Sequence, residues 1–162
     1  MNINTKVKLC CCQKMPIVAL GVWQSGKDTK QAVLDALKAG YRHIDTAACY
    51  GNEEAVGMAI KESGIPREEI FITTKLWNDD IRKHRTKEAL QESLRRLQVD
   101  YVDLYLIHWP VEGYIDAYLE MEKLKEAGLI KSIGVSNFRK SHLQNLLANV
   151  HKIPSVNQIE IN

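Results

Sequence analysis

The sequence lacks most of the features that mark membrane, nucleic-acid-binding and disulfide-rich proteins. Its longest apolar runs are only a few residues, whereas about 18 are needed to span a bilayer. The 22 basic and 20 acidic residues leave a net charge of +2, which gives no reason to expect a nucleic acid or a membrane surface as partner. The 162 residues, of which 45% are hydrophobic, suffice for one domain with its own core. We therefore expect a single domain over residues 1–162.

Cysteine is scarce, and its placement argues against a metal site or a disulfide framework. Cys10, Cys11 and Cys12 are consecutive, and Cys49 is the fourth. Neighbouring residues on one strand or turn point in different directions, so they make poor common ligands, and no Cys-X-X-Cys pair or nearby histidine completes a tetrahedral site. No secretory signal opens the chain, which favours the cytoplasm, where thiols stay reduced.

Short apolar runs alternate with longer stretches at helical spacing. The predicted strands are Ile17–Leu20, His43–Thr46, Ile70–Lys75, Val102–Ile107, Lys131–Val135 and Val156–Ile161. The predicted helices begin at Asp28, at Gly51 or Asn52, before Ala89, before Met121 and at Ser141. Ahead of them, Lys6–Leu9 and Met15–Val18 would form a small hairpin around the cysteine run. Strands that alternate with helices indicate a parallel sheet covered by helices.

Two architectures fit this alternation, a doubly wound open sheet and an eight-stranded (β/α)8 barrel. A Rossmann-type sheet should show GxGxxG after its first strand, but the first strand here leads into LGVWQSG, with only Gly21 and Gly26. In a TIM barrel, functional groups gather around one mouth, where the strands end. The barrel can therefore be tested by what stands at the strand ends.

Reactive side chains stand at the ends of three successive predicted strands. Asp45 and Tyr50 follow the second strand, Lys75 ends the third, and His108 follows the fourth. A phenol is a weak acid at neutral pH, and an ammonium beside it stabilises the phenolate and so strengthens the acid. Lys75 would be that ammonium, Asp45 would keep it charged, and His108 would orient a carbonyl group. Because no side chain supplies hydride, a nicotinamide cofactor would be required.

Each of these residues also has an ordinary structural interpretation. Asp45 could cap a turn, and Tyr50 could be a half-buried loop aromatic. Lys75 could be solvated, and His108 could be a satisfied structural histidine. The tryptophans near the strand ends could simply pack. The catalytic interpretation is favoured because the four groups occupy corresponding ends of three successive strands.

The longer motifs resemble those of the aldo-keto reductases. GYRHIDTAACYGNEEAVG, residues 40–57, resembles the first signature of that family, with Asp45 and Tyr50 at its catalytic positions. FITTKLW and LYLIHWP carry the matching Lys75 and His108, while IKSIGVSNF and VNQIEIN resemble a further signature and the sixth strand. The resemblance implies a (β/α)8 barrel with an N-terminal hairpin, and an oxidoreductase that reduces aldehydes and ketones with NADPH (NADP+).

The resemblance also implies which residues bind cofactor and substrate. The residues expected at the cofactor are Gly21, Val22, Trp23, Asp45, Ser136, Asn137 and Gln158. Those expected at the substrate are Trp23, Tyr50, Trp77, His108 and Trp109. Three tryptophans would thus form an apolar wall beside the reacting carbonyl.

The sequence departs from the family pattern in two places. The hairpin turn reads CCCQ in place of Asn and Gly, so we expect a looser or differently registered turn. A complete barrel runs to roughly 250 residues, whereas about six βα units are found here. We therefore expect an incomplete barrel, a truncated form with weak or no activity alone, unless the natural chain continues.

An incomplete barrel would leave its first and sixth strands as edges, which invite self-association. An alternative function is therefore a noncatalytic binding or assembly protein that keeps the same scaffold and associates through these exposed edges.

Overall fold

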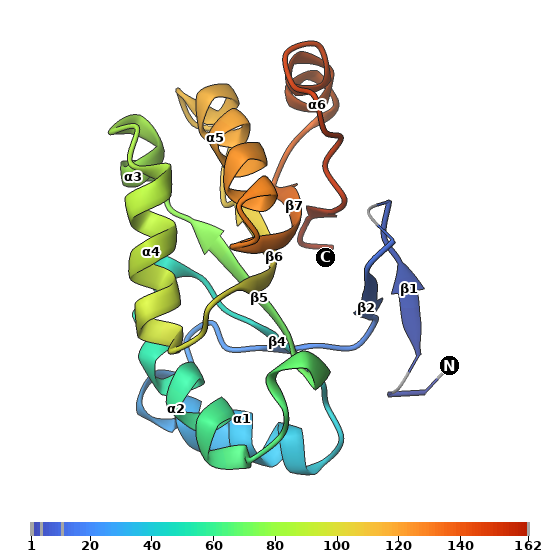
Figure 1. Ribbon diagram of the computed structural model, residues 1–162, viewed down its shortest axis with the longest axis vertical. Coiled ribbons are helices and arrows are strands. Elements are labelled where there is room, and N and C mark those ends of the chain that lie inside the picture. Colours follow the sequence, from blue (N-terminus) through green and yellow to red (C-terminus); the bar gives the residue numbers. More distant parts are fainter. Residues whose placement is uncertain (1, 4, 11, 162) are drawn as a thin grey trace.

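The computed structural model describes residues 2–3, 5–10 and 12–161, and a curled parallel sheet forms its centre (Figure 1). The sheet contains, in spatial order, β3 (Leu20–Gly21), β4 (His43–Asp45), β5 (Phe71–Leu76), β6 (Val102–Ile107), β7 (Ile130–Ser136) and β8 (Asn157–Gln158). All neighbouring strands of this sheet run parallel. The predicted incomplete barrel is confirmed.

Helices connect successive strands and cover the outside of the sheet. They are α1 (Thr29–Lys38), α2 (Glu53–Ser63), α3 (Asn78–Arg82), α4 (Thr86–Leu97), α5 (Tyr114–Glu126) and α6 (Lys140–Leu147). Single 3-10 turns occur at Gly26–Asp28, Ala48–Tyr50 and Arg67–Glu69. The short helix α3 was not predicted, because its five residues are too few to show a helical period.

The strands β5 and β6 are buried on both faces, as expected for parallel strands between helices and a barrel interior. On β5, Ile72 and Leu76 join the large core shared with the helices. Phe71 instead joins a smaller inner cluster with Leu104 and Leu106, onto which Leu9 of the hairpin packs. Side chains therefore alternate between the two cores along the strand.

The helix α4 shows why the outer layer is stable. Its buried residues recur at helical spacing, and they are Thr86, Ala89, Leu90, Ser93, Leu94 and Leu97. At its end α4 crosses α2 so closely that a Cβ added at Gly57 would lie 2.4 Å from the carbonyl oxygen of Leu97. Glycine is thus required on α2 at this crossing.

The N-terminal hairpin pairs β1 (Lys6–Lys8) with β2 (Lys14–Pro16) in antiparallel register, with Val7 opposite Met15. The N–H of Leu9 donates to the oxygen of Gln13 at 2.8 Å, and that of Cys12 donates to the oxygen of Leu9 at 2.9 Å. The turn is therefore closed rather than loose. Cys12 takes a left-handed φ of 68°, the conformation for which glycine is usual at this place in a hairpin. Cys11 lies outside the described residues.

Several predicted boundaries of strands and helices were wrong. The first barrel strand begins at Leu20 rather than Ile17, because the N–H of Ile17 donates to the oxygen of Thr5 and continues the hairpin. The last strand is limited to Asn157–Gln158, where pairing with β7 stops. The helix α6 begins before Ser141, with Arg139 at its N-cap.

Asp28 and Asn52 occupy the predicted N-cap positions of α1 and α2, but neither side chain makes a capping hydrogen bond. The side chain of Asn52 is used elsewhere, beside the candidate site. Helix starts can thus be read from residue type even when the expected contact does not form.

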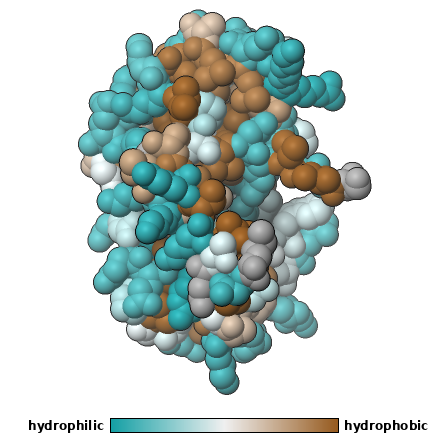
Figure 2. Space-filling view, turned by 90° about the vertical axis from the view of Figure 1, so that its right-hand side faces the viewer, coloured by the Kyte–Doolittle hydropathy of each residue, from teal (hydrophilic) through white to brown (hydrophobic). Residues whose placement is uncertain are grey.

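The side of the molecule that carries the hairpin and the C-terminal segment shows apolar surface gathered in its upper half (Figure 2). The large exposed apolar side chains include Ile153, Ile159 and Ile161. In the described part of the chain, no helix is long and apolar enough to cross a membrane. Residues 2–3, 5–10 and 12–161 also contain no group of three or more His, Cys, Asp or Glu side chains arranged for a metal ion.

Candidate active site

Asp45, Tyr50 and Lys75 lie together at the carboxyl ends of β4 and β5. The Lys75 ammonium is 1% exposed and donates to Asp45 Oδ1 at 2.5 Å. It also donates to the oxygen of Thr46 at 2.9 Å and to Tyr50 Oη at 3.3 Å. A buried ammonium needs such partners, because an isolated charge is strongly destabilised away from water. The predicted carboxylate, ammonium and phenol are therefore in direct contact.

His108 completes the group from the end of β6. Its ring centroid lies 5.9 Å from that of Tyr50, and the ring is largely buried. Burial, assisted by the charge of Lys75, lowers the pKa of His108 to about 4, although Asp45 acts in the opposite direction. The imidazole is therefore neutral at physiological pH and can donate only one N–H.

The residues predicted at the nicotinamide ring lie at the ends of β7 and β8. Asn137 Nδ2 donates to the oxygen of His108 at 3.1 Å and to Ser136 Oγ at 3.2 Å. Gln158 Nε2 donates to Asp45 Oδ2 at 2.6 Å. The amide oxygens, Asn137 Oδ1 and Gln158 Oε1, accept no hydrogen bond from any described residue. Two free acceptors thus point to a ligand with N–H donors.

Asn137 has a left-handed backbone with φ of 61°. Asparagine tolerates this conformation better than most residues. Its N–H donates to the oxygen of Gln158 at 2.8 Å, so the backbone joins the two amide-bearing residues directly. The two amides are therefore held in a fixed arrangement.

The segment Gly21–Trp23 begins at the last residue of β3 and lies beside the same strand ends. The N–H of Val22 donates to the oxygen of Asp45 at 3.1 Å, while its own oxygen accepts from Asn52 Nδ2 at 2.8 Å. Thr46 Oγ1 donates to Asn52 Oδ1 at 2.7 Å. Asn52 therefore ties the segment to the end of β4. From the sequence, Asn52 was expected only as a helix cap, although it belongs to the same motif as Tyr50.

The three tryptophans differ in their surroundings. Trp77 packs edge-on against His108, with ring centroids 5.2 Å apart, and the ring of Trp109 lies parallel to that of His108, with centroids 6.5 Å apart. Trp109 is 44% exposed, whereas Trp23 is 67% exposed. No aromatic ring among the described residues packs against Trp23. Two of the three tryptophans thus border His108 directly.

Cys49 is a neighbour of His108 that the sequence did not single out. Its Sγ lies 3.6 Å from Nδ1 of His108, a distance suited to a hydrogen bond that involves sulfur. The thiol is free and partly exposed to solvent. The sequence shows that Cys49 directly precedes Tyr50 in the motif. The contact between Cys49 and His108, however, depends on how β4 and β6 are placed in the sheet.

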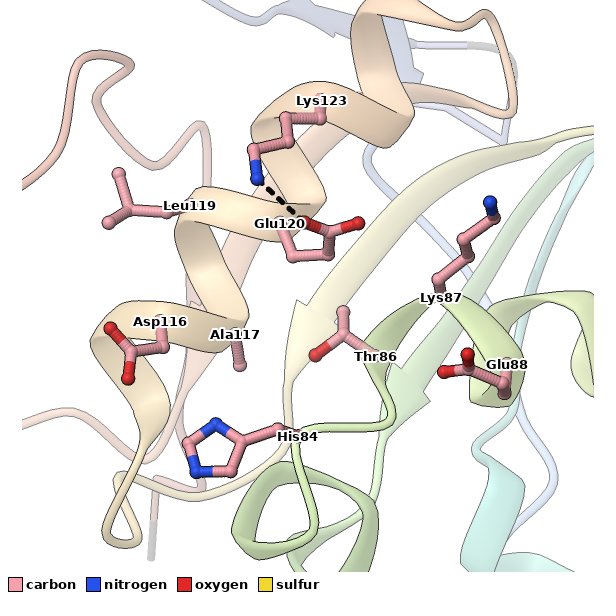
Figure 3. A pocket seen from close by; sticks show the side chains of 9 residues that line it. All are labelled: His84, Thr86, Lys87, Glu88, Asp116, Ala117, Leu119, Glu120 and Lys123. Atoms are coloured by element: carbon pink, nitrogen blue, oxygen red, sulfur yellow. Dashed lines mark hydrogen bonds and ion pairs between the residues drawn. The ribbon is translucent and has the colours of Figure 1, made fainter.

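A separate groove of about 430 Å³ lies between α5 and the start of α4 (Figure 3). Its lining includes both acidic and basic side chains, among them Asp116, Glu120 and Lys123, and the last two are paired at 3.0 Å. None of the site residues at the strand ends lines this groove. Chemistry at the strand ends therefore does not depend on it.

The fold and the motifs match known proteins. The model of the Aldo/keto reductase family matches residues 18–162. Methylglyoxal reductase DkgA of Yersinia pestis is 52% identical over 165 residues, which cover 99% of this chain and 59% of that protein. The corresponding Escherichia coli K12 protein is 52% identical over 161 residues, covering 97% of this chain and 58% of that protein.

Solved structures agree with this assignment. The aldo/keto reductase of Brucella melitensis has a TM-score of 0.93 and 51% identity, covering 97% of this chain and 63% of that one. The aldo-keto reductase of Bombyx mori in complex with NADP has a TM-score of 0.92 and 42% identity, covering 97% and 58%. The chain thus spans about three fifths of the length of these relatives. It belongs to the aldo/keto reductase family.

Proposed function

We propose that this site reduces aldehyde or ketone carbonyls, with Tyr50 as the general acid. The observation that carries the proposal is the contact chain from Asp45 through Lys75 to Tyr50, next to the neutral His108. A structural role would leave unexplained why a lysine that is 1% exposed is aimed at a phenol. Such an arrangement is useful when a phenol must give up a proton.

Each side chain then has a defined role. Tyr50 donates its proton to the carbonyl oxygen while hydride adds to the carbonyl carbon, so that the product is an alcohol. Lys75 stabilises the phenolate left on Tyr50, which regains a proton from solvent. The carboxylate of Asp45 keeps Lys75 charged and fixed. His108, being neutral, donates one hydrogen bond that orients the substrate carbonyl.

The proposed cofactor is NADPH, which would supply the hydride. The two free acceptors, Asn137 Oδ1 and Gln158 Oε1, suit the N–H donors of a nicotinamide carboxamide. Ser136 supports this pair, since its Oγ donates to the oxygen of Gln158 at 3.0 Å. The residues Gly21, Val22 and Trp23 would border the cofactor from the loop after β3. NADP in the Bombyx mori relative supports this choice.

The proposed substrate is a small carbonyl compound. Trp77 and Trp109 give an apolar border next to His108, and Trp23 would complete it from the Gly21–Trp23 loop. Relatives named methylglyoxal reductase make an α-oxoaldehyde the first substrate to test. The free thiols Cys10, Cys12 and Cys49 suit a reducing compartment such as the cytoplasm.

A second candidate function is assembly without catalysis. It is favoured by the two edge strands of the sheet, β3 and β8, and by the exposed Ile159 and Ile161 near the second edge. The close packing of Lys75 against Tyr50 gives such a protein no advantage, so we place this function second.

The test is NADPH-dependent reduction of methylglyoxal by the protein and by Tyr50→Phe. Loss of the general acid should lower kcat by about 100-fold or more, with little change in NADPH binding measured by fluorescence titration. Tyr41→Phe, which changes a tyrosine at the opposite end of β4, is the matched control and should keep the native rate. An unchanged rate in Tyr50→Phe would sink the proposed mechanism.

A further inference from the structure

The contact between Cys49 and His108 bears on how the imidazole is protonated. Cys49 Sγ is the only hydrogen-bonding group that the described residues place on the His108 ring, and it meets Nδ1 at 3.6 Å. The other nitrogen, Nε2, has no hydrogen-bond partner among the described residues. It is also not one of the side-chain atoms that are buried without a partner. Nε2 therefore faces the open part of the site.

We propose that Cys49 is a positioning residue for carbonyl reduction. Its thiol donates a hydrogen bond to Nδ1 of His108 and so keeps the ring proton on Nε2, where it can meet the substrate oxygen. The effect on carbonyl reduction rests on the proposed function, but the hydrogen bond between Cys49 and His108 exists without cofactor or substrate.

The protonation of both groups supports this direction of donation. Partial desolvation raises the pKa of the Cys49 thiol, although the charge of Lys75 opposes that shift, so the thiol keeps its S–H. The His108 imidazole is neutral and therefore has one nitrogen with a lone pair and one with a proton. The thiol is weak both as a donor and as an acceptor, but the lone pair of a neutral imidazole nitrogen is a good acceptor, so S–H donation to it is the better use of this contact.

The position of Cys49 makes the role specific. It directly precedes Tyr50, so one short turn, Ala48–Tyr50, supplies both the acid and the group that orients the histidine. His108 is further held by its neighbours, because Asn137 Nδ2 binds its carbonyl oxygen and Trp77 and Trp109 border its ring. These contacts fix where the ring lies but leave the choice of protonated nitrogen to Cys49.

The test measures the tautomer of His108 directly by NMR of protein labelled with 15N-histidine, without NADPH or substrate. The His108→Gln variant identifies the His108 signals among those of the five histidines. We expect a protonated Nε2 and an unprotonated Nδ1 in the native protein, a mixture of both forms in Cys49→Ala, and the native form in Cys49→Ser, which keeps a donor. Cys10→Ala, which removes another exposed thiol, should leave the spectrum of His108 unchanged.

Three results would overturn the proposal. The first is a protonated Nδ1 in the native protein, and the second is a tautomer that Cys49→Ala does not change. The third is equal disturbance in Cys49→Ser and Cys49→Ala, which would exclude the hydrogen bond as the cause. In turnover, Cys49→Ala should lower kcat by about twofold to tenfold, as for loss of one hydrogen bond, with Cys49→Ser closer to native. If no variant turns over substrate, the proposed function fails while the NMR result still decides the role of Cys49.

Discussion

The neutral His108 illustrates how one residue couples the site to the stability of the protein. Its pKa is lowered from 6.5 to about 4 by burial and by Lys75. Between these values the unfolded chain binds more protons than the native protein, so stability rises with pH across this window. The contribution of His108 is therefore fully present above about pH 6.5 and is lost as the pH falls toward 4.

This linkage predicts a difference between the native protein and His108→Gln. Urea unfolding at pH 7 and at pH 4.5 should show a larger loss of unfolding free energy in the native protein than in the variant. His43, whose pKa burial also lowers, is present in both proteins and accounts for part of the loss that remains. Equal losses in the two proteins would contradict the shift assigned to His108.

At the same scale, the sequence was a good guide to which side chains gather at the strand ends and a poor guide to their neighbours. Asp45, Tyr50, Lys75 and His108 could be found because they stand at strand ends within long motifs. The contact of Cys49 with His108 could not be found, because it joins residues 59 positions apart across β4, β5 and β6. Such contacts depend on packing, which no local pattern records.

At the scale of elements, the strand Val102–Ile107 was predicted with its observed bounds, because its residues are apolar except for Asp103. Short elements were less predictable. The helix α3 and the two-residue strand β8 are set by the elements against which they pack, and neither shows a period of its own. The close crossing of α2 and α4 is likewise a tertiary feature, although the sequence motif of residues 40–57 includes Gly57.

That crossing gives a prediction about stability. Gly57→Ala would force a Cβ to within 2.4 Å of the oxygen of Leu97 and to 2.6 Å of its carbon, both backbone atoms. Since backbone on α4 cannot move away as a side chain can, we expect a loss of about 1–3 kcal/mol or more in unfolding free energy, measured by urea denaturation. The control Met58→Ala, at an exposed position on the same helix, should change it by about 0.5 kcal/mol at most. A Gly57→Ala protein as stable as the control would contradict the close crossing.

At the scale of the whole molecule, the curled sheet brings the site together while leaving β3 and β8 with one paired side each. Gln158 of β8 reaches Asp45 of β4, so the far edge still contributes to the site. The candidate site residues are therefore brought together at the strand ends by the six strands of the sheet.

The unpaired edges predict association between copies of the chain. Sedimentation velocity should show oligomers that grow with concentration, and Ile159→Lys should weaken them because a charge beside an edge strand opposes pairing. Ile153→Lys, at a similarly exposed residue outside the sheet, is the matched control. A monomer at all concentrations, or equal weakening by both variants, would contradict association through β8.

In the proposed function, hydride reaches the carbonyl carbon in this site while Tyr50 protonates the oxygen. The most direct measurement is mass spectrometry of the alcohol formed from an aromatic aldehyde with NADPH that carries deuterium at both C4 positions. We expect one deuterium on the former carbonyl carbon in the product of the native protein, and no deuterated alcohol with Tyr50→Phe beyond a small residual. Alcohol without deuterium, or equal deuterium transfer by Tyr50→Phe, would contradict it.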